Sequence, residues 1–115
     1  MKLPKIIKLG HFDIKLKSLP NELASSNEEE GSFYSSVRTI YIDENIIEKG
    51  GVDLISVLFH ELLHASYYKN NLNKNSTEED LVNSFSNDLT ELISRTKLLD
   101  IINFNLRGKN YENKS

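Results

Sequence analysis

The residues best suited to chemistry stand together in an apolar segment that reads LFHELLHA, from Leu58 to Ala65. His60 and His64 are four positions apart, and Glu61 follows the first histidine. In a helix, positions i and i+4 lie on the same face, so the two imidazoles can converge on one point. Ionisable groups in an apolar segment cost free energy unless something satisfies them, and a metal ion bound by both histidines would do so.

This arrangement is the HExxH pattern, in which the glutamate is the general base of a zinc peptidase. Glu61 lies about 100° around the helix from His60, so it cannot chelate with the histidines but can reach a metal-activated water. We therefore predict one zinc ion bound by His60 and His64, and peptide-bond hydrolysis with Glu61 as the base. In the alternative interpretation, backbone or carboxylate groups satisfy both imidazoles.

A zinc site needs a third protein ligand, and the chain has no cysteine to supply one. His11 lies in a predicted turn far upstream and is expected at the surface. Glu78, Glu79 and Asp80 begin a later predicted helix, and two antiparallel helices would bring that turn near the histidines. Glu78 lies four residues before Val82 and Glu79 three, so either glutamate can share a helix face with Val82 and be the ligand. Helix capping and interaction with the helix dipole are the alternative roles of the acidic trio.

The elements that position these residues follow from the hydrophobic pattern. Apolar and charged residues alternate over residues 11–19, which predicts a strand, and residues 4–9 are its candidate partner across a turn at Gly10. Residues 20–32 hold small polar and acidic residues and predict a connection with a short helical turn. Residues 33–43 are rich in β-branched and aromatic residues and predict one or two strands.

The histidines belong to the first long helix that the sequence predicts. Gly50 and Gly51 interrupt the chain, and Asp53 is placed to cap this helix. The segment from Leu54 to Tyr68 contains neither glycine nor proline and is apolar almost all round. Such a composition predicts a helix that is buried on most sides.

A second helical segment comes after a polar loop. Ser76 or Thr77 is placed to cap it, and it continues to about Leu106, either unbroken or with a break near Thr96. Residues 107–115 are expected to form a polar, frayed tail. The apolar residues expected at helical spacing, with the first three facing the histidine helix, are Val82, Phe85, Leu89, Leu92 and Ile93.

Composition limits the partners. The net charge of −3 gives no basic surface for nucleic acid or for an anionic membrane. No segment approaches the roughly 20 apolar residues of a membrane span, and the lysine-rich N-terminus has no apolar core of signal-peptide length. We therefore expect a cytoplasmic protein that binds neither nucleic acid nor membrane. Strands precede helices, which predicts an α+β fold with a small antiparallel or mixed N-terminal sheet.

The segments LFHELLHASYY and STEEDLVNSFSNDL resemble the small phage-encoded metallopeptidases related to the ImmA/IrrE group, a minimal form of the gluzincins. In larger relatives the second signature is E-x-x-A-N-x-F-A. Residues 79–86, EDLVNSFS, match it with conservative changes, and this match implies that Glu79 is the third ligand. The segment EEEGSFYSSVRTIYIDENI also resembles the family's glycine, connection and I-x-I-D strand. The LLMP element and DNA-binding domain of larger relatives are not seen, so repressor cleavage is not implied.

The resemblance covers about residues 8–105 and implies a single zincin-like domain over residues 1–106, with the sheet packed on the HExxH helix and on one or two C-terminal helices. As in zincins generally, Thr39–Asp43 would be an edge strand that pairs with an extended peptide substrate, although an ordinary core strand fits the sequence equally well. Tyr68, with Tyr67 beside it, is a candidate oxyanion donor, and packing is its alternative role. The candidates for orienting the imidazoles are Asp43, Asn83 and Asp88.

Two other function classes stay open. A non-catalytic zincin-like module with a structural or absent metal fits a chain with little room for a substrate cleft. A toxin-like or inhibitor-like phage accessory protein without metal is the third class. Glu61 favours hydrolysis, because a purely structural site has no use for a general base. If the protein is phage-encoded, its compartment is the cytoplasm of the host cell.

Overall fold

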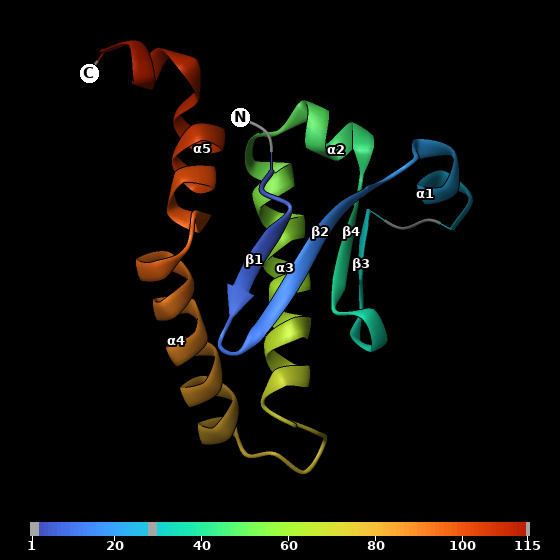
Figure 1. Ribbon diagram of the computed structural model, residues 1–115, viewed down its shortest axis with the longest axis vertical. Helices are drawn as coiled ribbons and strands as arrows, with labels where there is room; N and C mark the ends of the chain where they lie inside the picture. Colours follow the sequence, from blue (N-terminus) through green and yellow to red (C-terminus); the bar gives the residue numbers. More distant parts are fainter. Residues whose placement is uncertain (1–2, 28–29, 115) are drawn as a thin grey trace.

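In a computed structural model of the protein, the described residues are 3–27 and 30–114, with side chains described for 3–24 and 30–107. The fold is α+β, as predicted: one four-stranded mixed sheet lies on a long central helix, with two further helices at the side of the first strand (Figure 1). In chain order the elements are β1 (Ile6–Leu9), β2 (Phe12–Leu19), α1 (Asn21–Asn27), β3 (Gly31–Tyr34), a 3-10 turn (Ser35–Val37), β4 (Thr39–Asp43), α2 (Glu44–Lys49), α3 (Gly51–Lys69), α4 (Glu78–Arg95) and α5 (Leu98–Lys114).

The strand order across the sheet is β1-β2-β4-β3. β1 and β2 form the predicted hairpin, β2 and β4 are parallel, and β3 returns antiparallel to β4. The prediction that Thr39–Asp43 is an edge strand is therefore wrong. β4 is hydrogen-bonded on both sides, so its backbone has no free edge for a substrate. The edge strand beside it is β3.

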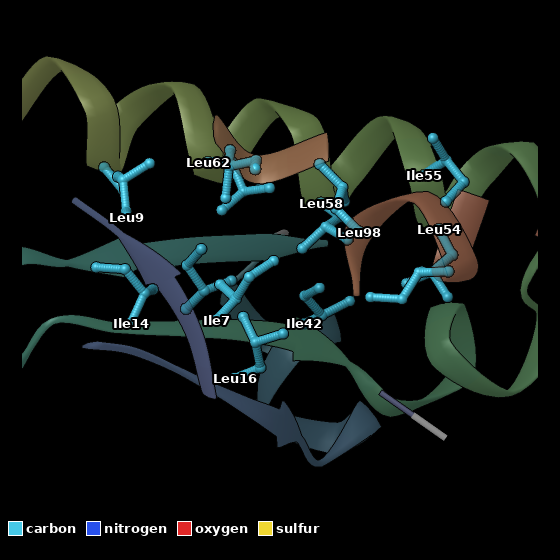
Figure 2. Packing of buried hydrophobic residues seen from close by; sticks show 14 residues of the cluster. Ile7, Leu9, Ile14, Leu16, Ile42, Leu54, Ile55, Leu58, Leu62 and Leu98 are labelled. Carbon is cyan, nitrogen blue, oxygen red and sulfur yellow. The ribbon is translucent and has the colours of Figure 1, made fainter. Parts of the chain in front are cut away.

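One face of the sheet packs on α3 and forms the core (Figure 2). Alternate strand residues point to this face because side chains alternate along a strand. The helix contributes residues three and four apart, which lie on one stripe. The core residues with exposed fractions of 3% or less include Ile7, Leu9, Ile14, Ile40, Ile42, Leu54, Leu58, Ala65, Leu92, Leu98 and Ile101.

The helix α3 is buried on one face and exposed on the other, so the prediction of burial on most sides is wrong. Leu63 is 48% exposed and Tyr67 37% exposed, although both are apolar or aromatic. The apolar residues all round the helix thus serve two purposes. One stripe builds the core, and another lines the surface around His60 and His64.

Asp53 does not cap α3, because the helix begins two residues earlier. Gly50 and Gly51 have φ angles of 65° and 68°, which favour glycine. The backbone N–H of Gly51 donates to Asn105 Oδ1 on α5 at 2.9 Å, so a residue distant in the sequence caps α3. Asp53 instead pairs with Lys49 Nζ at 2.6 Å, and this hydrogen bond and charge raise the pKa of Lys49 above its usual value.

The helix α4 begins at the predicted cap. Thr77 Oγ1 accepts from the backbone N–H of Asp80 at 3.1 Å, and Asp80 Oδ2 accepts from the N–H of Thr77 at 3.0 Å, which is a complete capping box. The predicted break near Thr96 is confirmed, because α4 ends at Arg95 and α5 starts at Leu98.

A polar cluster joins α4 to α3. The buried Asp88 accepts hydrogen bonds from Ser66 Oγ at 2.6 Å, Lys69 Nζ at 2.8 Å and Asn70 Nδ2 at 2.9 Å. Asp88 points toward α3, whereas Val82, which was expected to face α3, is 53% exposed. The contact stripe of α4 therefore lies to one side of the stripe that the sequence predicted.

The C-terminal prediction is tested only in part. The backbone of α5 is helical to Lys114, but the side chains of residues 108–115, most of the predicted tail, lie outside the described residues. Within the described ranges, no helix combines the length and apolar composition that crossing a membrane requires.

Replacing Asp88 with alanine should lower the free energy of unfolding by about 3 kcal/mol, because the largely buried Lys69 ammonium and the Ser66 hydroxyl both lose their partner. Urea denaturation measures the change. Asn83→Ala, an exposed change on the same helix, should alter stability by less than about 0.5 kcal/mol. Equal effects of the two substitutions would show that the cluster does not stabilise the helix pair.

Candidate metal centre

His60 and His64 lie side by side on the exposed face of α3. Their Nε2 atoms are 3.2 Å apart, and the ring planes meet at 73°. Two ligands of a tetrahedral zinc, each at 2.0–2.1 Å, are separated by about 3.4 Å. The pair therefore fits one metal ion. The same distance also allows one imidazole to donate a hydrogen bond to the other, which pairs the two Nε2 atoms without a metal.

Glu61 lies beside the two histidines but is buried, with 5% of its surface exposed. Its carboxylate reaches the strand β3. A methyl group at Gly31 would lie 3.3 Å from Glu61 Oε2 and 2.7 Å from Val57 Cγ1. The absence of a side chain at residue 31 is therefore what lets the strand approach this part of α3.

An open hollow of about 560 Å³ brings these groups together. On one side it is bounded by the HExxH residues, and on the other by the edge strand. Such a groove between a helix and a strand edge can admit an extended chain. Its lining includes His60, Glu61, His64, Tyr67 and Tyr68 from α3, and Gly31, Ser32 and Phe33 from β3.

Tyr68 packs against other aromatic rings and also lines the hollow, while its role as an oxyanion donor stays a prediction. Its ring packs against Phe12 and Phe33, with centroid distances of 5.9 and 6.0 Å. It also lines the hollow and keeps 40% of its surface exposed, as does Tyr67 with 37%. Packing thus holds the Tyr68 ring at the wall of the hollow.

The structure does not bring the predicted third ligand to the histidines. Glu78 and Glu79 are exposed in the first turn of α4, and among described residues no three His, Cys, Asp or Glu side chains form a metal-binding group. Asp80 is engaged in the capping box. The third ligand therefore stays a prediction.

The helix α4 nevertheless borders the histidines. Phe85 lines a second hollow together with His60 and His64. Glu78 is seven residues before Phe85, which is two helical turns, and so lies on nearly the same stripe. Glu79 lies about 100° further round the helix. Helix geometry thus favours Glu78, whereas the motif match favours Glu79.

The residues considered for orienting the imidazoles have other roles. Asp43 caps α2, where its Oδ1 accepts from the N–H of Asn45 at 3.0 Å. Asp88 belongs to the cluster between α3 and α4, and Asn83 is exposed on α4. His11 is exposed in the hairpin turn, as expected.

Sequence reasoning placed no site residue on β3. The signal was a glycine followed by two adjacent aromatic residues, Phe33 and Tyr34, in a segment that the family resemblance included but did not connect to the histidines. Only the pairing of β3 outside β4 brings Gly31 and Phe33 to the hollow. A strand order is a long-range property that local patterns do not specify.

Gly31→Ala should lower the free energy of unfolding by about 1–3 kcal/mol, because the added methyl group overlaps Val57. Val57→Ala in the same chain should recover part of this loss, since it removes the nearest atom. A double-mutant cycle in urea measures the coupling. Additive effects of the two substitutions would mean that the strand and helix are not in close contact at this position.

Comparison with known proteins assigns no family. No family model, no curated protein and no solved structure matches this chain. The resemblance to small phage metallopeptidases therefore depends on the motif residues alone. What the structure establishes beside it is a pair of convergent imidazoles, a buried glutamate and an α+β fold with a four-stranded mixed sheet.

Proposed function

We propose that the protein is a zinc-dependent peptidase with a minimal zincin-like fold. The observation that carries the proposal is the pair of Nε2 atoms 3.2 Å apart, next to a carboxylate that is buried against the edge strand. Two surface histidines with a packing role would not need to converge. A glutamate with a solvating role would not be 5% exposed.

In this proposal His60 and His64 hold the ion, and the first turn of α4 supplies the third ligand, Glu79 or as second choice Glu78. When bound, zinc acts as a Lewis acid that lowers the pKa of water and polarises a carbonyl group. Glu61 accepts the proton that the attacking water loses and passes it to the leaving amine. Its burial against β3 holds the carboxylate in one position for both steps.

The substrate backbone would pair with the edge strand β3, because β4 is an inner strand of the sheet. Glu30 O accepts from Asp43 N at 2.9 Å, which makes these two residues a hydrogen-bonded pair of the antiparallel ladder. Hydrogen-bonded and non-hydrogen-bonded pairs alternate along such a ladder, so the backbone groups of Gly31 and Phe33 point away from β4. These are the β3 residues on the α3 face, where Glu61 lies.

A non-catalytic zincin-like binding module is the second candidate. The observation that favours it is the 3.2 Å distance between the two Nε2 atoms, at which one imidazole can donate a hydrogen bond to the other without a metal. In that case the hollow binds a partner.

Zinc binding tests the ligand set. Purified protein should bind one zinc ion, and His64→Ala should weaken binding by more than about 100-fold, since a directly bound ligand contributes more than the groups that orient it. His11→Ala is the control and should leave binding unchanged. Competition with a chromogenic chelator gives the affinities.

Glu78→Ala and Glu79→Ala, assayed in the same way, decide between the two glutamates. We expect the larger loss for Glu79→Ala. A larger loss for Glu78→Ala would move the ligand by one residue, and unchanged affinity in both would remove α4 from the site. A wild-type protein without affinity for zinc would overturn the proposed function.

Glu61→Gln separates catalysis from metal binding. The variant should keep its zinc but hydrolyse a mixed peptide library about 10²–10⁴-fold more slowly than wild type, because the amide cannot accept the proton. Mass spectrometry of the digested library measures the rates. Equal hydrolysis by both proteins would show that Glu61 is not the general base. No hydrolysis by either protein with zinc bound would leave the binding module as the function.

A further inference from the structure

The sheet face that points away from α3 carries an apolar hollow of about 440 Å³ at its β3 edge. Ile40 and Ile42 face the core, so Tyr41 between them faces away from α3. Tyr34 packs on Tyr41 with a centroid distance of 5.6 Å and a ring angle of 74°. The hollow is completed by Leu19, Leu23, Ser32, Ser36 and Val37.

Large apolar side chains stay solvent-exposed at this hollow. Tyr34 is 49% exposed, Leu23 52% and Val37 54%. A cluster of exposed apolar residues bordering a groove marks a binding surface more often than isolated ones do. Ser32 lies between the two hollows and lines both of them. Its Oγ is buried and has no hydrogen-bond partner among the described residues.

The two hollows lie on opposite faces of one strand edge. Gly31 and Phe33 border the hollow with the histidines, whereas Ser32 and Tyr34 border the apolar hollow. A chain that pairs with β3 continues the sheet, so its own side chains alternate between the same two faces. One set would point toward His60 and Glu61, and the other toward Tyr34.

We infer that this surface selects extended peptides with large apolar or aromatic residues at every second position. The inference rests on the proposed function and specifies its substrate class. The alternate side chains enter the hollow of Tyr34, Val37 and Tyr41. The peptide side chains on the other face of the strand point toward Glu61, where hydrolysis takes place in the proposed function.

The other edge of the sheet provides a matched control. Ile6 on β1 is 49% exposed, like Tyr34, and also points away from the core, because its neighbour Ile7 is buried. However, β1 lies beside α4 (Figure 1), at the edge of the sheet opposite to β3 and its hollow. Replacing Ile6 with serine therefore removes an exposed apolar side chain, as Tyr34→Ser does, but leaves β3 unchanged.

The test measures peptide binding to zinc-loaded Glu61→Gln protein, so that it does not depend on turnover. Two fluorescent peptides have the same length and composition, one with tyrosine and leucine at every second position and one with these residues in a single block. We expect the alternating peptide to bind at least about tenfold more tightly. Tyr34→Ser and Val37→Ser should each remove about tenfold of this affinity, and Ile6→Ser should not.

Equal affinity for the two peptides would overturn the inference, as would an effect of Ile6→Ser equal to that of Tyr34→Ser. Circular dichroism checks that each variant is folded. If Tyr34→Ser does not fold, Val37→Ser still tests the inference. If the binding pattern holds but wild-type protein cleaves neither peptide, the proposed function fails, and the β3 surface stands as a peptide-binding site.

Discussion

Glu61 is buried while the histidines beside it are exposed, and this difference arises from the way α3 packs on the sheet. Leu54, Leu58 and Ala65 fill one stripe of the helix against the core, and each buried leucine contributes about 1.5–3 kcal/mol. Rotating the helix to bury the histidines would expose those leucines. The core therefore holds His60 and His64 at the surface and leaves Glu61 at the boundary between the two.

The edge strand depends on the same packing. Because α3 presents Val57 and Glu61 to β3, a side chain at residue 31 would force Val57 to shift, and glycine lets the strand lie this close. This close approach puts an open strand edge and a helix-borne carboxylate within one groove. In the proposed function, the two histidines hold the ion and the strand edge adds backbone groups that can pair with a peptide.

Local patterns predicted the features that depend on near neighbours. The alternation in β2, a helix cap at Ser76 or Thr77 and the convergence of the two histidines were predicted correctly, because each depends on residues that are close in the sequence. Features that depend on distant segments were not. The sequence could not show that β3 would pair outside β4 and turn Thr39–Asp43 into an inner strand.

The histidine helix shows the same limit. Its apolar residues predicted burial all round, but whether a leucine such as Leu63 is covered depends on where α4 packs. That position is set partly by the buried Asp88, whose partners come from the end of α3. A polar residue in an amphipathic helix gives no local sign that it will be the point of attachment. For the same reason, motif and spacing limited the candidates for the third ligand to Glu78 and Glu79 but could not show where either side chain lies relative to the histidines.

The cap of α3 by Asn105 has a consequence for how the protein is made. The first N–H of the helix that carries both histidines finds its acceptor 54 residues later in the chain. Leu98 and Ile101, on the same helix as Asn105, complete the core around α3. During synthesis the emerging chain therefore lacks both the cap and these core residues until α5 has been translated. The face of α3 that carries His60 and His64 therefore takes its final form only after Asn105 has been translated.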